Sequence, residues 1–163
     1  MLVVVADTSP IRYLVQIDHI ELLAQLFGRV IIPTVVAQEL RHPSAPPGVQ
    51  SWINAPPPWL EISSQTATDD PELDQLDPGE RSAIELGIAV KADLILIDER
   101  RGAAAAAGRG LTTTGTIGVL DLAAERGLVD LRSAFDRLKT TNFRYRRAML
   151  DELIERRSRP KSE

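Results

Sequence analysis

The stretch "LVVVADTSPI" (residues 2–11) is an apolar run that ends at an acid, Asp7, and is followed by residues typical of a helix start. An apolar run of this length is typical of a strand in a parallel sheet that helices cover on both faces. Ser9 followed by Pro10 is a favourable N-cap and first helical residue. The stretch therefore predicts a buried strand that passes directly into a helix, with Asp7 between them.

The same pattern of a short apolar run and a helical segment recurs along the chain. The runs "RVIIP" (29–33) and "DLILI" (93–97) predict two more buried strands, and "LTTT" (111–114) predicts a weaker one. Strands that alternate with helices predict an α/β fold with helices around a mainly parallel sheet. The helices are expected over 9–17, 20–27, 33–40, 78–92, 99–108, 115–127, 130–139 and 144–157.

The composition is that of an ordinary globular protein. The chain has 163 residues, of which 44% are hydrophobic and 26% are charged, and this length suits one core rather than two domains. We expect a single domain over 1–157, followed by a polar tail at 158–163. The proline-rich and acidic segment 41–79 is expected to be a surface excursion that contains one possible short helix and strand.

Several classes of protein are disfavoured by the sequence. There is no cysteine, which excludes disulfides and thiolate zinc sites, and His19 and His42 are too isolated for a His-rich zinc enzyme. We expect no membrane partner and a cytoplasmic location, because no apolar run approaches membrane-spanning length and the N-terminus lacks the basic stretch of a signal peptide. The net charge of −4 argues against nucleic-acid binding by bulk charge, although basic residues crowd 144–161.

Two acids, Asp7 and Asp98, come directly after predicted strands. In open α/β sheets, ligands bind outside the carboxyl ends of the strands. Two carboxylates at one sheet edge repel each other unless a positive group lies between them, and a hard divalent cation is the obvious candidate. The alternative for Asp98 is that it caps the helix predicted to begin near Glu99.

Two further acids, Glu39 and Glu80, lie on the apolar faces of predicted helices. At about 100° per residue, Glu80 lies about 40° from Ile84 and Glu39 about 40° from Val35. A carboxylate on a buried face is unfavourable unless a cation or hydrogen-bond donors compensate it. In the alternative reading, Glu80 completes a capping box opened by Asp77, and Glu39 is a partly solvated residue of a last helical turn.

Four motifs, in this order along the chain, resemble the PIN-domain nuclease superfamily: "VVVADTSPI", "IPTVVAQEL", "LDPGERSAIELGIAVKADLILIDERRG" and "GTIGVLDLAAERGLV". The resemblance implies a Rossmann-like three-layer α/β/α domain with a metal-dependent nuclease site at the sheet edge. It implies that Ser9 supports the first acid. It also implies that catalysis and the binding of Mg²⁺ or Mn²⁺ belong to Asp7, Glu39, Glu80 and Asp98.

The resemblance further implies an activity and partners. It indicates an endoribonuclease that hydrolyses RNA phosphodiester bonds, the toxin of a toxin–antitoxin pair, an antitoxin over the acidic cleft, and a homodimer. Many toxin members carry another Asp or Asn shortly after the fourth acid, where this chain has Glu99, Arg100 and Arg101. This departure favours a less characterised branch of the superfamily. We assign a supporting role to Glu99 and substrate contacts to Arg100 and Arg101.

Two other function classes stay open at this point. A Mg²⁺-dependent phosphatase also ends its first strand in Asp, but usually has a second Asp two residues later, where this chain has Ser9. A non-catalytic binding module would show no metal-dependent turnover. Outside the acids, Arg109 is a candidate phosphate contact or a solvated surface residue. Phe143 and Tyr145, beside the arginines of the C-terminal segment, are candidates for stacking on RNA bases.

Overall fold

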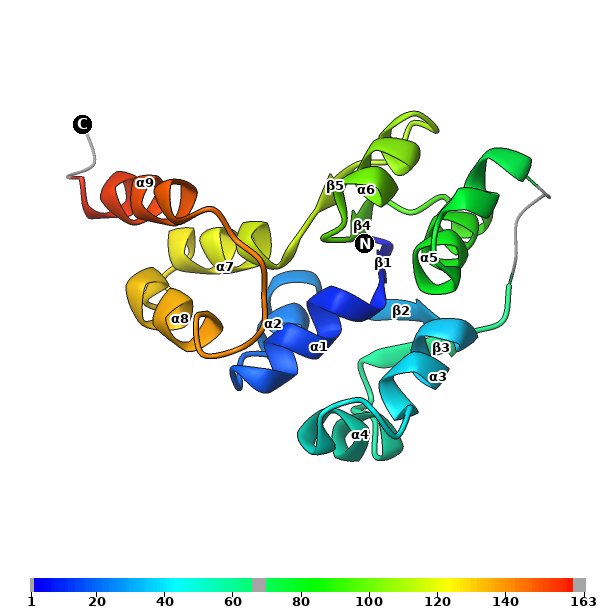
Figure 1. The fold of residues 1–163 in the computed structure, drawn as a ribbon, viewed down its shortest axis with the longest axis horizontal. Helices are drawn as coiled ribbons and strands as arrows, with labels where there is room; N and C mark the ends of the chain where they lie inside the picture. Colours follow the sequence, from blue (N-terminus) through cyan, green and yellow to red (C-terminus); the bar gives the residue numbers. More distant parts are fainter. Residues whose placement is uncertain (1, 66–69, 160–163) are drawn as a thin grey trace.

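A five-stranded sheet forms the centre of the molecule. The computed structural model describes residues 2–65 and 70–159 (Figure 1). The strand order is β3-β2-β1-β4-β5, and each pairing is parallel, which confirms the predicted α/β fold and places the first strand in the middle. The strands are β1 Val4–Ala6, β2 Val30–Pro33, β3 Leu60–Ser63, β4 Leu94–Leu96 and β5 Thr113–Thr114.

Helices cover both faces of this sheet and give the molecule three layers. On one face, α1, α2, α3 and α7 share a large hydrophobic cluster with the sheet, and α8 and α9 extend that layer. On the other face, α5 and α6 pack against the sheet. The helices are α1 Thr8–Gln16, α2 Leu22–Phe27, α3 Thr34–Arg41, α4 Pro47–Asn54, α5 Pro78–Val90, α6 Arg100–Ala107, α7 Thr116–Glu125, α8 Leu131–Leu138 and α9 Arg147–Ser158, with a 3₁₀ turn at Pro71–Gln75.

Strand β1 is buried on both faces, which explains why its sequence carries no polar residue. Residues Val4–Ala6 are fully buried. Their side chains alternate between the two hydrophobic clusters, and Val5 packs with Ile95 of β4 on the side of α5 and α6. The backbone N–H of Asp7 donates a hydrogen bond to the carbonyl of Leu96 at 2.9 Å. The sheet ladder therefore holds the first acid rigidly at the edge.

The segment 41–79 is expected from the sequence to be a surface excursion, but it also adds a strand to the central sheet. It contains α4 and β3, and β3 extends the sheet by pairing with β2 from Val30 opposite Leu60 to Pro33 opposite Ser63. Leu60 is buried, but the two residues that follow it are exposed. An edge strand of this kind has a weak apolar pattern, so the sequence underestimates it. Residues 66–69 lie outside the described residues.

The three C-terminal helices contact one another at one end of the molecule, on the left in Figure 1. Arg157 of α9 donates hydrogen bonds to both carboxylate oxygens of Asp121 in α7, at 2.8 and 3.0 Å. Ser158, the first residue of the predicted polar tail, is still helical, and residues 160–163 lie outside the described residues. Within 2–65 and 70–159, no helix has both the length and the hydropathy needed to cross a membrane.

Candidate active site

The carboxyl ends of β1 and β4 bring two of the predicted acids to the same edge of the sheet. These strands pair directly, with Ala6 opposite Leu96. Asp7 follows β1 immediately, and Asp98 comes two residues after the end of β4. The negative charge of Asp98 contributes to raising the pKa of Asp7, so the two carboxyl groups act on each other electrostatically. This edge is where open α/β sheets bind their ligands.

A cleft of about 510 Å³ opens at this edge and includes all four predicted acids. They come from four separate segments: the end of β1, α3, the start of α5, and the loop after β4. The described residues that line the cleft are Asp7, Thr8, Ser9, Arg12, Tyr13, Glu39, Asp77, Glu80, Asp98, Glu99, Asn142, Phe143 and Arg144. This lining is mainly acidic, so the cleft attracts cations and repels phosphate until its charge is compensated.

Asp7 caps α1, which corrects the prediction that Ser9 would be the N-cap. Helix α1 begins at Thr8, directly after the strand, and the Asp7 side chain accepts a hydrogen bond from the Thr8 backbone N–H at 2.7 Å. Asp7 is only 5% exposed. The pKa of Asp7 is raised to about 7, mainly by burial; the negative charges of Asp77 and Glu39 contribute to this rise, and the bond from the Thr8 N–H opposes it. The buried charge of Asp7 is therefore compensated either by a bound proton or by a nearby cation.

Glu39, near the end of α3, reaches the cleft beside Asp7. Its carboxylate accepts a hydrogen bond from the Thr8 hydroxyl. Gly79, in the first turn of α5, lets this helix approach closely: a Cβ at Gly79 would lie 2.6 and 2.9 Å from the two Glu39 oxygens and 3.0 Å from Asp7 Oδ1. Glu39, Asp7 and the first turn of α5 therefore pack so closely that residue 79 has no space for a side chain.

Glu80 is buried at the start of α5, next to Asp77. Asp77 Oδ1 accepts a hydrogen bond from the Glu80 backbone N–H at 2.9 Å, so the predicted cap of this helix is present. The Glu80 carboxyl is also directed into the cleft and is only 7% exposed as a residue. Burial raises the pKa of Glu80, and its hydrogen bond to the Asp77 carboxyl adds to this. Two carboxyl groups in contact retain a proton between them unless a cation replaces it.

Asp98 is held by Thr116, a residue that the sequence analysis did not single out. The backbone N–H and the hydroxyl of Thr116 donate to the two Asp98 oxygens at 2.6 and 2.7 Å. Asp98 therefore caps the start of α7, and not the helix near Glu99. Burial raises the pKa of Asp98, while the bonds from Thr116 and from the Ser9 hydroxyl lower it. Ser9 thus supports the fourth acid, which corrects its assignment to the first.

The sequence did contain a signal for Thr116. It follows a glycine directly after the weak strand and opens the helical segment 116–125, where a hydroxyl residue commonly serves a helix start. Gly115 has the same kind of close approach as Gly79, since a Cβ there would lie 2.5 Å from Asp98 Oδ1. The pair Gly115–Thr116 therefore shapes the position of Asp98, although it lies in a different part of the sequence.

The donor chemistry of the cleft suits a hard divalent cation, but the carboxylates are not arranged as the ligands of one ion. Among the described residues, no group of three acid or histidine side chains is placed to hold a metal together. The available donors are all oxygens, as Mg²⁺ and Mn²⁺ prefer. The raised pKa values of Asp7, Glu80 and Asp98 show acids whose charge lacks compensation. An ion would be held only after these carboxylates turn toward one another.

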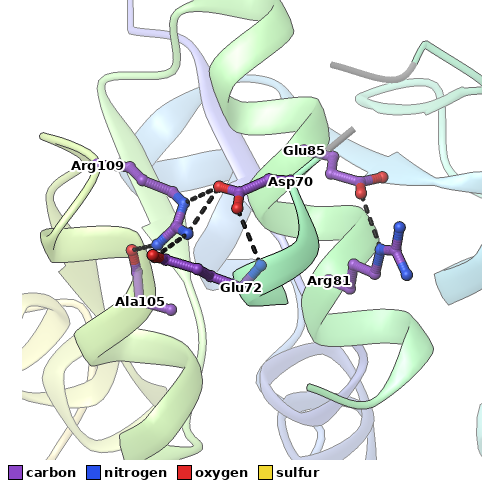
Figure 2. A network of polar contacts seen from close by, with 6 residues as sticks. All are labelled: Asp70, Glu72, Arg81, Glu85, Ala105 and Arg109. Atoms are coloured by element: carbon purple, nitrogen blue, oxygen red, sulfur yellow. Dashed lines mark hydrogen bonds and ion pairs between the residues drawn. The ribbon is translucent and has the colours of Figure 1, made fainter. Parts of the chain in front are cut away.

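Arg109 is a structural residue and not the phosphate contact considered from the sequence. It donates to Asp70 Oδ2 at 2.8 Å, to Glu72 Oε2 at 3.2 Å and to the Ala105 carbonyl at 2.9 Å (Figure 2). Its hydrogen bond holds the pKa of Asp70 below the usual range. The network ties the end of α6 to the 3₁₀ turn, with contacts from Nε and from both terminal nitrogens of the guanidinium.

Arg100 and Arg101, predicted to contact the substrate, are not among the described residues that line the acidic cleft. Arg101 donates to Gln75 Oε1 at 3.3 Å, and Arg100 lines a neighbouring cavity, whereas Glu99 lines the acidic cleft itself. The sequence analysis missed Arg12 of α1, which lines the cleft and whose Nε is buried with no hydrogen-bond partner in the described part of the chain. An arginine within the apolar pattern of α1 was the signal available for it.

A family model matches nearly the whole chain. It is the DUF3368 model, which describes a PIN domain, and it matches residues 3–159. No curated protein matches the chain, and no solved structure matches it either. The matched span contains every residue that lines the acidic cleft.

Proposed function

The chain belongs to the PIN-domain family, whose members are generally nucleases, and on this premise we propose that it is a metal-dependent endoribonuclease. The observation that carries the proposal is the acidic cleft. Asp7, Glu39, Glu80 and Asp98 come from four separate segments and line one cleft at the carboxyl edge of the sheet. The reaction would be the hydrolysis of an RNA phosphodiester bond.

The four acids would hold Mg²⁺ or Mn²⁺ through their carboxylate oxygens. When bound, the ion would supply an activated water and would neutralise charge that builds up on the attacked phosphate. Thr116 and Ser9 keep Asp98 oriented, and Thr8 does the same for Glu39. These bonds hold both carboxylates at the cleft.

Two further groups prepare the cleft for a charged substrate. The raised pKa of Glu80, caused mainly by burial, favours its protonated form, and ion binding would release that proton. Arg12 also lines the cleft, and we propose that its guanidinium contacts a phosphate bound there. This positive charge would offset part of the repulsion between the acids and the substrate.

The proposal is tested by incubating a panel of structured and single-stranded RNAs with the protein, with Mn²⁺ or with EDTA. The wild-type protein is expected to cut internally in Mn²⁺ and not in EDTA. The Asp98→Asn variant should lose this cleavage because it removes a charged ligand, while its one oxygen can still accept from the Thr116 backbone N–H and its amide NH₂ can donate to the Thr116 hydroxyl. Cleavage that persists equally in EDTA, or equally in the variant, would contradict the assignment.

A non-catalytic binding module is the second candidate, and one observation favours it: no three carboxylates in the described residues are placed to share an ion. A titration with Mn²⁺ separates the two functions. A nuclease binds the ion and turns over RNA, whereas a binding module retains RNA or a protein without cutting it. The phosphatase alternative gains nothing from the structure, because Ser9 is bound to Asp98 and offers no second carboxylate.

The proposal extends to the partners of the protein. A toxin of a toxin–antitoxin pair would need its cleft covered in the resting state, and an antitoxin could do this by presenting an arginine to the carboxylates. Family membership and the acidic lining support this extension. We also propose a homodimer in the cytoplasm. Co-expression with a small protein encoded next to this chain, followed by size-exclusion chromatography, tests both the complex and the oligomeric state.

Gly79→Ala is expected to reduce Mn²⁺-dependent cleavage at least about tenfold with little change in stability. The new Cβ would lie 2.6 Å from a Glu39 oxygen and would push that flexible carboxylate out of the cleft. Alanine in the first turn of a helix otherwise favours folding by up to about 1 kcal/mol. Cleavage rates over a range of Mn²⁺ concentrations, with thermal unfolding of the same samples, provide the measurement.

Gly48→Ala is the matched control for this change. Gly48 also follows a proline in the first turn of a helix, α4, but nothing lies within 4 Å of a Cβ built there. Its variant should keep wild-type cleavage. Equal activity of the Gly79 and Gly48 variants would show that the contact with Glu39 has no part in the reaction.

A further inference from the structure

A second cavity, of about 630 Å³, adjoins the acidic cleft. Asp98, Phe143 and Arg144 line both hollows, so the two are direct neighbours. The second cavity has a different lining from the first. It is formed by apolar side chains such as Ile117 and by arginines, and Asp98 is its one acid among the described residues.

The wall between the two hollows is the segment 142–146, which connects α8 to α9 and passes beside α1 in Figure 1. Tyr13 of α1 fixes this segment in two ways. Its hydroxyl donates to Asn142 Oδ1 at 2.8 Å, and its ring meets the Phe143 ring edge-on, with 5.0 Å between the ring centroids. The residues after Phe143 are therefore held in a defined place at the mouth of the acidic cleft.

The arginine side chains of the second cavity have no partner among the described residues. Arg100, Arg144 and Arg146 line it, and none of the three has a hydrogen bond or ion pair to another part of the described chain. Arg109 and Arg157, by contrast, are each held by two acids. Three exposed guanidinium groups beside a single acid give this cavity a local positive charge on a chain of net charge −4, and this charge would attract an anion.

The cavity also exposes an aromatic ring. Tyr145, just before α9, is 39% exposed, and Met149, in the first turn of α9, is 47% exposed. An exposed aromatic side chain between arginines is the arrangement by which proteins stack unpaired bases and bind the adjoining phosphates. A base in a duplex is not free to stack on such a ring, so the arrangement selects single strands.

We propose that the second cavity is a nucleobase subsite for single-stranded RNA, in which Tyr145 stacks on a base and Arg144 and Arg146 bind the neighbouring phosphates. The strand then passes Phe143 and places its next phosphate in the acidic cleft. This inference rests on the proposed nuclease function and adds to it the position of one base subsite and the residues that form it. It requires a base at one position relative to the scissile bond, and it requires that base to be unpaired.

The test measures binding of a fluorescently labelled eight-nucleotide single-stranded RNA by anisotropy, in Mn²⁺ and in an Asp7→Asn background that prevents cleavage. Tyr145→Ala is expected to weaken binding about tenfold, whereas Tyr145→Phe keeps the stacking ring and should bind like the parent. Leu128→Ala is the control, because Leu128 is 40% exposed and lies outside both hollows. A duplex of the same sequence should bind equally weakly to parent and Tyr145→Ala.

The outcomes separate this inference from the proposed function. Metal-dependent cleavage by the otherwise wild-type protein, together with unchanged RNA binding by Tyr145→Ala, would overturn the subsite and leave the nuclease standing. An absence of both RNA binding and cleavage in the wild-type chain would overturn both. If Tyr145→Ala converts a dimer into a monomer without weakening RNA binding, the cavity is covered by a second copy of the chain and the inference is wrong.

Discussion

Asp7→Asn is expected to abolish Mn²⁺-dependent RNA cleavage, with a loss on the order of 100-fold or more, while the fold is retained. Changes to the partners of metal ligands already cost about 10–100-fold, and Asp7 is itself the proposed ligand. Asparagine has the same shape and can still accept the hydrogen bond from the Thr8 backbone that caps α1. The substitution therefore removes the charge of the site and leaves its scaffold.

The measurement is the initial rate of cleavage of a labelled single-stranded RNA over a range of Mn²⁺ concentrations, with circular dichroism of the same protein. Asp18→Asn is the matched control. Asp18 follows the other end of α1, its side chain is 88% exposed, and its positive φ of 61° is one that asparagine tolerates. The control should keep full activity. Full activity of Asp7→Asn would remove Asp7 from the reaction.

The metal-free protein is expected to lose stability as the pH rises from about 4 to about 7, and Asp7→Asn should lose less of it. Burial raises the pKa of Asp7 from 3.8 to about 7, so the folded protein holds this proton more tightly than the unfolded chain. The contribution is fully present below the unfolded pKa and is lost as the pH passes through the folded one. The interval between the two values corresponds to at most roughly 4 kcal/mol.

Urea unfolding in EDTA at several pH values gives the measurement, and the quantity of interest is the difference between wild type and Asp7→Asn. The wild type should become steadily less stable relative to the variant as the pH rises. Glu80 and Asp98 also have raised pKa values and act in the same direction in both proteins. Saturating Mn²⁺ should flatten the wild-type profile, because the ion compensates the charge in place of the proton. Parallel profiles in EDTA would contradict the burial argument.

Local pattern was sufficient to predict the layers of the fold and the edge where the acids meet. A strand such as β1 is buried on both faces, so each of its residues must be apolar, and the acid that ends it stands out. Edge strand β3 was underestimated because its exposed residues obey no such requirement. Prediction of strands from the sequence was therefore most reliable for segments such as β1, where burial on both faces permits only apolar residues.

The interior of the site was less predictable because its contacts join distant segments. Ser9 and Thr116 both act on Asp98, and the bond from Thr116 crosses eighteen positions. Arg109 was considered a phosphate contact, but its acidic partners lie more than thirty positions before it. No local spacing indicates which acid a hydroxyl or guanidinium will reach. Such assignments require the relative placement of helices, which packing decides.

The central place of β1 in the sheet has a consequence for synthesis of the protein on the ribosome. The first strand to emerge has β4 as one neighbour, and the acid after β4 is oriented by Thr116. The wall that Tyr13 holds in position belongs to residues 142 and 143. Asp7 is therefore translated long before the segments that complete the cleft around it. Under the proposed function, a centre able to cut RNA would form only after residues 142 and 143 had been translated.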